Sequence, residues 1–387
     1  MADKSIVSPE EGYCRILEGF RQENRFRVIP PAYDPRSVFD LGANDYLGLA
    51  NRHDELRKEF MKSFPDASFS SSASRLLSSN QEYHDALENL LSELYGRPAL
   101  LFNSGYHANT GAISALNIPS TLFLCDKLVH ASIIDGLAIG NADFRRWKHN
   151  DLRLLEKALE MHAASYERVI IVVESVYSMD GDISPLPKLV ELKKRYPNVM
   201  LYIDEAHAFG VFGKRGLGLA EELSLIKDID ILVGTLGKAA ASSGAFVAVS
   251  PVIRDFLVNC ARSFIFSTAL PPVNCAWSLF IISRITEMKE ERMHLRKISR
   301  RFRDRISAIT GMPNVSDSQI IPFVIGNNRD TLEMSAKLRD QGIIAPAIRR
   351  PTVPPGGERI RFSLNAGLTG EDIDRIADII AESFKKI

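Results

Sequence analysis

A single lysine, Lys238, stands between an apolar run and a stretch of small residues in the segment "DILVGTLGKAAASSG". An amine among apolar and small side chains is partly desolvated, which lowers its pKa and makes it a nucleophile towards carbonyl carbons. Most lysines in proteins lie on surface turns and have no such role. The residues around Lys238 favour the other reading, a lysine that forms a Schiff base.

A carboxylate and a histidine follow another apolar run in "YIDEAHAFG", at Asp204 and His207. The pair could be an ordinary capped turn. Alternatively, Asp204 could hold the protonated ring nitrogen of pyridoxal phosphate (PLP), which makes the ring an electron sink, while His207 donates to the ring oxygen. A metal site is less favoured because neither a cysteine pair nor an HExxH motif supplies further ligands. We therefore expect no metal.

The segment "LLFNSGYHANTGA" follows a third apolar run and opens a predicted helix. The backbone N–H groups near Gly105 and Tyr106 would then lie at a helix N-terminus, where phosphate groups bind. An ordinary loop would look similar. No GxxxxGK motif is present, which argues against a nucleoside triphosphate site. His130 in "LVHASIIDG" is, taken alone, more typical of a structural histidine.

The elements that must position these residues are short apolar runs between helical segments. Continuous hydrophobicity indicates strands buried on both faces, which is typical of a largely parallel sheet covered by helices. Glu174, Asp204 and Thr235 each end such a run. Ligands bind beyond the carboxyl ends of strands in open α/β sheets, so we expect these groups to converge on one crevice. Six runs are predicted as strands: "ALLFN", "TLFLCD", "RVIIVVE", "VMLYIDE", "DILVGT" and "GAFVAVS".

The length of 387 residues suits one large domain with a smaller one. We predict an N-terminal arm over residues 1–50, a large domain over 51–285 and a small α+β domain over 286–387. The arm carries an amphipathic helix over 9–24. A long helical region from Pro272 to about Arg305 is predicted to lead out of the large domain.

The composition excludes several classes of function. Lysine plus arginine equals aspartate plus glutamate at 48 each, so no net field favours nucleic acid or an anionic membrane. Four widely spaced cysteines form no CxxC, which argues against a disulfide framework and fits a reducing cytosol. No apolar run approaches the roughly 18 residues of a membrane helix. We expect a cytoplasmic protein without nucleic-acid or membrane partners.

Taken together, these segments resemble the α-oxoamine synthase family of fold type I PLP-dependent transferases, over nearly the whole chain. The resemblance implies an α/β fold: a large domain with a mostly parallel seven-stranded sheet between helices, and a small α+β C-terminal domain. Eight motifs carry it, in order: "NDYLGL", "SGYHAN", "DKLVHAS", "ESVYSMDGD", "DEAHAFGVFGKRGLG", "TLGK", "FSTALPP" and "RRPTVPPGGERIRFSLNAG".

The resemblance also implies roles for individual residues. Lys238 would carry the cofactor and later act as the base, Asp204 would hold the ring nitrogen, and His207 the phenolic oxygen. His130 would stack on the ring and assist proton transfer, with Ser178 beside the ring. The phosphate would be held by Gly105, Tyr106 and Thr235, with Ser267 and Thr268 of a second subunit, which implies a homodimer with shared active sites. The substrate would be bound by Asn44, Arg361 and Arg349.

The reaction implied is condensation of a small amino acid with an acyl-CoA or acyl-carrier-protein thioester, usually with loss of carbon dioxide. Within the family, "SQIIPFVIG" and "AIRRPTVPPGGERIRFSLNA" are most similar to the members that join L-alanine to a pimeloyl thioester in biotin biosynthesis. Residues 69–80 and the "AAASSG" after Lys238 depart from the family's glycine-rich pattern. Glycine or serine acyltransferases of the family share every catalytic residue and stay alternatives, as does a noncatalytic scaffold.

Overall fold

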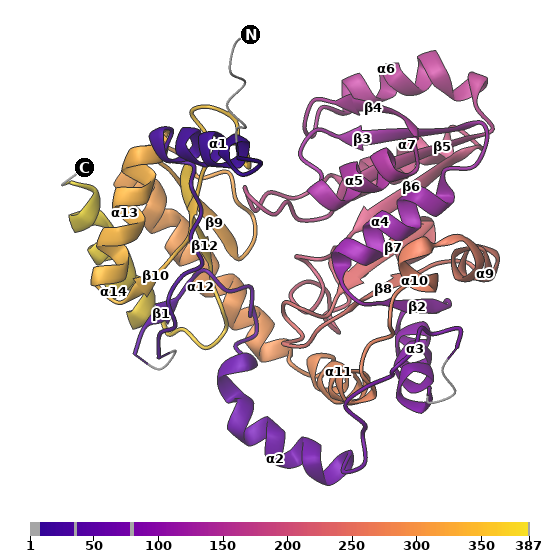
Figure 1. Ribbon diagram of the computed structural model, residues 1–387, viewed down its shortest axis with the longest axis horizontal. Coiled ribbons are helices and arrows are strands. Elements are labelled where there is room, and N and C mark those ends of the chain that lie inside the picture. Colours follow the sequence, from indigo (N-terminus) through magenta and orange to yellow (C-terminus); the bar gives the residue numbers. More distant parts are fainter. Residues whose placement is uncertain (1–7, 35–36, 78–80, 386–387) are drawn as a thin grey trace.

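A seven-stranded sheet dominates the computed structural model, which describes residues 8–34, 37–77 and 81–385. The strand order is β2-β8-β7-β6-β5-β3-β4, and β8 alone runs antiparallel to its neighbours (Figure 1). The predicted mostly parallel, seven-stranded sheet is therefore confirmed. Its strands are β2 (Ala99–Phe102), β3 (Thr121–Asp126), β4 (Asp143–Trp147), β5 (Arg168–Glu174), β6 (Val199–Asp204), β7 (Ile231–Thr235) and β8 (Ala245–Ala248).

Six of these strands coincide with the six apolar runs, whereas the seventh, β4, is not among them. β4 lies at the edge of the sheet beside β3. Asp143, Arg145 and Arg146 of this strand are exposed. Because charged residues are typical of edge strands, a search for continuous apolar runs passes over such a strand.

Helices cover both faces of the sheet, so that its residues enter two separate buried clusters. This burial on both sides explains the continuous hydrophobicity of the strands. One face is covered by α4 (Gly105–Leu116), α5 (Ala131–Ile139), α9 (Pro251–Cys260) and α10 (Arg262–Ile265). The other is covered by α3 (Glu82–Tyr95), α6 (Leu152–His162), α7 (Leu186–Lys194) and α11 (Pro272–Ile285).

The long helical region predicted from Pro272 consists of two helices rather than one. α11 ends at Ile285, and α12 (Lys289–Thr310) begins after three intervening residues. The two helices have different partners, because α11 packs against α3 while α12 packs against α14 (Gly370–Phe384) and β9 (Ile320–Val324). One straight helix could not serve both surfaces.

The C-terminal residues build a second, smaller sheet in the order β11-β12-β9, all antiparallel. Its other strands are β11 (Ala347–Ile348) and β12 (Arg359–Ser363), and α13 (Asn328–Asp340) joins α12 and α14 in covering it. The N-terminal strand β1 (Phe39–Asp40) pairs with β10 (Ile343–Ile344). The arm is thus attached to the C-terminal part, and the division at residues 50 and 285 stays a prediction.

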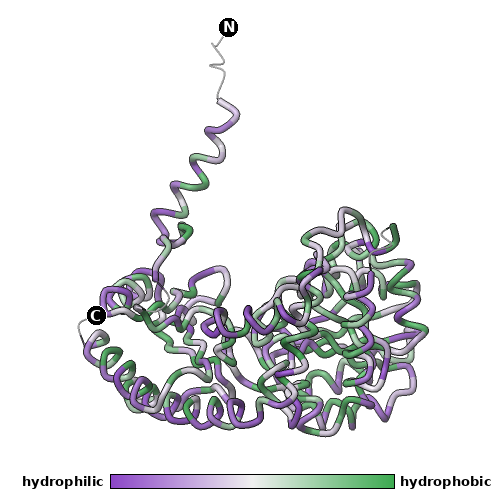
Figure 2. The backbone as a smooth tube through the Cα atoms, turned by 90° about the horizontal axis from the view of Figure 1, so that it is seen from below, coloured by the Kyte–Doolittle hydropathy of each residue, from purple (hydrophilic) through white to green (hydrophobic). Residues whose placement is uncertain are grey.

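The predicted N-terminal helix is confirmed as α1 (Glu11–Gln22), which projects away from the body of the molecule (Figure 2). None of its residues is buried. The four cysteines are free, as expected. Within the described residues, none of the helices has the length and apolar character required to cross a membrane. The remaining short elements are η1 (Ala50–Arg52), α2 (His53–Ser63), η2 (Ala163–Ser165), α8 (Leu219–Glu222) and η3 (Ile226–Asp228).

Candidate active site

The functional groups predicted to converge do so at the carboxyl ends of three adjacent strands. Glu174 ends β5 and pairs in register with Asp204, which ends β6 and pairs with Val233 of β7. Lys238 follows the end of β7 by three residues, after Thr235. Parallel strands end at a common edge, so the order of the strands places these side chains together.

A chain of hydrogen bonds runs from the lysine to an asparagine of the N-terminal arm. Nζ of Lys238 lies 2.9 Å from Nε2 of His207, and Nδ1 of His207 lies 2.6 Å from the hydroxyl of Tyr46. The Tyr46 hydroxyl in turn donates to Oδ1 of Asn44 at 3.0 Å. Tyr46 and His207 are both buried, so these contacts are sheltered from water.

The protonation states of Lys238 and His207 determine which group donates in each of these hydrogen bonds. Burial lowers the pKa of Lys238 to about 8, although the charges of Asp204 and Glu174 oppose the shift. Burial, followed by the positive charges of Lys238 and Arg361, holds the pKa of His207 far below its ordinary value. At neutral pH a protonated Lys238 therefore donates to the neutral His207, which donates through Nδ1 to Tyr46.

The guanidinium of Arg361, from β12, lies at the end of this series of hydrogen bonds that is opposite to Lys238. Its Nη1 donates to Oδ1 of Asn44 at 3.1 Å and to the hydroxyl of Ser363 at 2.7 Å, and its Nε donates to the carbonyl of Ser178. Arg361 is buried, and no carboxylate is recorded as its ion-pair partner among the described residues. A buried, uncompensated guanidinium is suited to bind a substrate carboxylate.

Asp204 belongs to a second network, which reaches His130. Oδ2 of Asp204 accepts from the amide of Asn109 at 2.8 Å, and that amide also donates to the hydroxyl of Ser132 at 3.0 Å. Ser132 lies 2.8 Å from Nδ1 of His130. Since Ser132 accepts from Asn109, its own proton is free for Nδ1, and His130 then carries its proton on Nε2. Tyr202 completes the network by donating to Oδ1 of Asn109.

Burial, and then the negative charge of Asp204, raises the pKa of Glu174 well above its ordinary value. Lys238 and the backbone N–H groups of Ser178 and His130 act against this shift. Oε1 of Glu174 is buried without a partner among the described residues. Through these two N–H groups, Glu174 connects the loops that carry His130 and Ser178.

A candidate phosphate cradle lies at the start of α4. Ser104 caps this helix, accepting from the N–H of His107. The first N–H groups of a helix have no partner within it, so those of Gly105 and Tyr106 are available for an anion. A Cβ added at Gly105 would lie 3.6 Å from Oγ1 of Thr235, so a side chain there would fill the cradle. The side chain of Tyr106 points elsewhere, donating to Asp135.

These groups fit PLP in kind: an amine of lowered pKa, a buried carboxylate and a helix N-terminus with a hydroxyl beside it. The described residues contain no group of three or more His, Cys, Asp or Glu side chains placed to hold a metal ion. The sequence did not single out four of the site residues, although each lies inside one of the eight motifs: Tyr46, Asn109, Ser132 and Ser363.

Three predicted site residues make no recorded hydrogen bond to the residues around Lys238 within the described part of this single chain. Arg349 donates to the carbonyls of Asn24 and Phe26, so it fastens the N-terminal arm. Ser267 is partly buried and Thr268 exposed, and no hydrogen bond is recorded for either side chain in the described part of the chain. Their assignments to substrate and to the partner's cofactor stay predictions.

The chain is similar in sequence and in structure to proteins of a known family. The family model "Aminotransferase class I and II" matches residues 36–380. An 8-amino-7-oxononanoate synthase from Haemophilus ducreyi is 47% identical over 382 residues, covering 96% of this chain and 97% of its own. A serine palmitoyltransferase from S. paucimobilis, solved with a PLP–myriocin aldimine, superposes with a TM-score of 0.87 at 27% identity, covering 99% of each chain.

A structure of 8-amino-7-oxononanoate synthase from Francisella tularensis superposes with a TM-score of 0.77 at 28% identity, covering 91% of this chain and 99% of its own. The likeness extends over nearly the whole length of the chain and is found in sequence as well as in structure. The chain therefore belongs to the aminotransferase class I and II family, among its α-oxoamine synthases.

Proposed function

We propose that this protein condenses L-alanine with a pimeloyl thioester, releasing carbon dioxide and the free thiol and forming 8-amino-7-oxononanoate for biotin biosynthesis. One observation carries the proposal: the chain is 47% identical, along 96% of its length, to a relative named for this activity. The arrangement of Lys238, His207 and Arg361 supports it, because an amine and a carboxylate-binding group are joined by hydrogen bonds.

We assign the cofactor PLP to this site, held by Lys238, by Asp204 and by the start of α4. When bound, PLP withdraws electrons from the α-carbon of an attached amino acid. The carboxylate of Asp204 is fixed by the amide of Asn109 and by the N–H of Ala206 at 2.9 Å. This fixed negative charge is suited to keep a ring nitrogen protonated.

The chain's own residues would bind the substrate and move the proton. Arg361 would bind the carboxylate of the amino acid through its guanidinium, with Asn44 holding the guanidinium in place. Lys238, with a pKa of about 8, is close enough to neutrality to serve as a base at its Nζ. His130 would present the proton on its Nε2 to the site from the opposite network.

A homodimer is part of the proposal, and exposed apolar side chains support it. Phe69 is 83% exposed and Phe266 69% exposed. Phe266 directly precedes Ser267 and Thr268, the residues predicted to reach a partner's cofactor. A second copy would cover these side chains and complete the site. We place the activity in the cytoplasm.

The test is a matrix of substrates assayed by release of free thiol. The purified protein is incubated with alanine, glycine or serine, each paired with a short, a dicarboxylic or a long acyl-CoA. The proposal predicts the fastest release with L-alanine and pimeloyl-CoA. Fastest release with serine and a long acyl-CoA would replace it with the activity of the serine palmitoyltransferases that superpose on this chain.

A further inference from the structure

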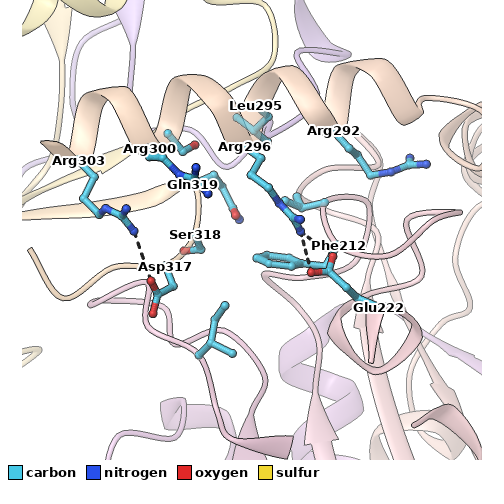
Figure 3. A pocket seen from close by; sticks show the side chains of 13 residues that line it. Phe212, Glu222, Arg292, Leu295, Arg296, Arg300, Arg303, Asp317, Ser318 and Gln319 are labelled. Atoms are coloured by element: carbon cyan, nitrogen blue, oxygen red, sulfur yellow. Dashed lines mark hydrogen bonds and ion pairs between the residues drawn. The ribbon is translucent and has the colours of Figure 1, made fainter. Parts of the chain in front are cut away.

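A basic cavity of about 230 Å³ lies between α12 and residues 211–222 (Figure 3). Four arginines of α12 line it, at positions 292, 296, 300 and 303. Residues spaced by three or four lie along one face of a helix, so the arginines form a row above the opening. Glu222 and Asp317 lie opposite that row.

The carboxylates neutralise only two of the four guanidiniums. Arg296 donates to both oxygens of Glu222, at 2.8 and 2.6 Å, and Arg303 donates to Asp317 at 3.3 Å. Arg292 donates to the carbonyls of Ile285 and Lys214, which carry no charge. The lining residues therefore carry an excess of two positive charges.

Arg300 differs from the other three arginines of the row in its contacts. No hydrogen bond or ion pair is recorded for it within the described residues, and it is exposed. Its guanidinium has five donors that are free for an incoming oxyanion. The neighbouring Arg296 and Arg303 limit where that anion can lie (Figure 3).

Two buried polar atoms in the lining also have no hydrogen-bond partner in the described part of the chain. The hydroxyl of Ser299, a residue only 5% exposed, has none among the described residues. Oε1 of Gln319, a residue 2% exposed, is likewise unpaired, and its identity as oxygen is fixed because Nε2 donates to the carbonyl of His207 at 2.9 Å. A buried polar atom without a partner costs about 1–3 kcal/mol, so a pair of them at one cavity points to a ligand.

We propose that this cavity binds a small phosphate-bearing molecule. Guanidiniums bind phosphate through paired hydrogen bonds, and the hydroxyl of Ser299 adds a further donor. The unpaired acceptor on Gln319 requires a ligand that also donates a proton, as hydrogen phosphate or a hydroxylated phosphate monoester does and a dicarboxylate does not. The volume has room for about eight water-sized groups, which suits a small phosphate.

The cavity is separate from the proposed catalytic centre, yet Gln319 connects them. None of Lys238, Asp204 or Arg361 lines it. A bound phosphate would join α12 of the C-terminal part to Gln319, which holds the backbone of His207. Because Phe212 and Glu222 line the same cavity, a ligand there would lie at the contact between the two parts of the fold.

Binding is tested on the cofactor-loaded protein, so that the phosphate of PLP already occupies the start of α4. Inorganic phosphate is titrated at constant ionic strength, and binding is followed by calorimetry and by the melting temperature. Because phosphate also stabilises proteins by exclusion from their surfaces, a matched variant is needed. Lys297→Ala removes one exposed positive charge from the same helix but does not line the cavity.

We expect saturable binding of phosphate to the wild type and to Lys297→Ala, and about tenfold weaker binding to Arg300→Ala, the loss of a charge-assisted hydrogen bond. Ser299→Ala should weaken binding without lowering the melting temperature of the phosphate-free protein. Equal binding by Arg300→Ala and Lys297→Ala, or tighter binding of succinate than of phosphate, would overturn the assignment. The acyl transfer itself is not measured, so failure here leaves the proposed function untouched.

Discussion

Replacing Tyr46 by phenylalanine removes the central link between Lys238 and Asn44 while keeping the ring that packs in the core. The Tyr46 hydroxyl is buried and lies 2.6 Å from Nδ1 of His207. Asn44 keeps Arg361 and Ser363 as donors, so the loss falls on the histidine. A buried N–H without an acceptor costs about 1–3 kcal/mol, and we expect the free energy of unfolding to fall by that amount.

The same loss should appear in turnover rather than in substrate binding. Without Tyr46 as acceptor, His207 gains by moving its proton to Nε2, where it faces the protonated Lys238. The resulting misplacement of Lys238, worth about 1–3 kcal/mol, corresponds to a fall in kcat of roughly 5-fold to 150-fold. KM for the amino acid should change little, because Arg361 keeps its contacts with Asn44 and Ser363.

Steady-state kinetics and urea denaturation of Tyr46→Phe and of a control variant test whether the Tyr46 hydroxyl contributes to turnover. Tyr95→Phe is the matched control, since the hydroxyl of Tyr95 is also buried and donates to the carbonyl of Leu217 at 2.8 Å, far along the chain from Lys238. Both variants should lose stability, and only Tyr46→Phe should lose kcat. If the two variants keep equal kcat values, the hydrogen-bond chain has no part in turnover.

Three further predictions concern the ring nitrogen, the scaffold and the assembly. Asp204→Ala should lose far more turnover than PLP affinity, measured by kinetics and cofactor titration; normal turnover would contradict the role of Asp204. Burial alone would lower the pKa of His149, but hydrogen bonds to Asp126 and Asp182 raise it to about 10. The shift corresponds to about 5 kcal/mol, and partial exposure reduces this to about 2. Because the pKa is raised on folding, this stability is complete below about pH 6.5 and is lost as the pH rises through about 10. The unfolding free energy of wild type and His149→Gln should therefore converge towards pH 10, and a constant difference would refute the assignment. Light scattering should give the mass of a dimer, whereas a fully active monomer would exclude shared sites.

The sequence predicts the central strands well because burial on both faces leaves a signal within each strand's own residues. Strands buried on both faces must be apolar throughout, as in "RVIIVVE". The edge strand β4 has no such requirement. Its exposed Asp143 and Arg145 interrupt the apolar pattern, so a search for continuous apolar runs does not find it. The break between α11 and α12 is equally hidden, since it depends on which partner each helix meets.

The site residues likewise differ in how far the sequence predicts them. Lys238 and Asp204 could be identified because Asp204 ends a buried strand and Lys238 closely follows another, which places both at the carboxyl edge of the sheet. The partners that orient them lie far away in sequence: Tyr46 and His207 are 161 residues apart, and Asn109 and Asp204 are 95 apart. A hydrogen bond over such a separation leaves no periodic signal, so a buried tyrosine or asparagine looks like any other core residue.

The most direct test of the central claim is to find where the cofactor is attached. The PLP-loaded protein is reduced with borohydride, digested and examined by peptide mass spectrometry. The account predicts the mass of one reduced pyridoxyl phosphate on the peptide that contains Lys238 and on no other lysine. Attachment at a different lysine, or no attachment in a protein that still releases thiol, would contradict it.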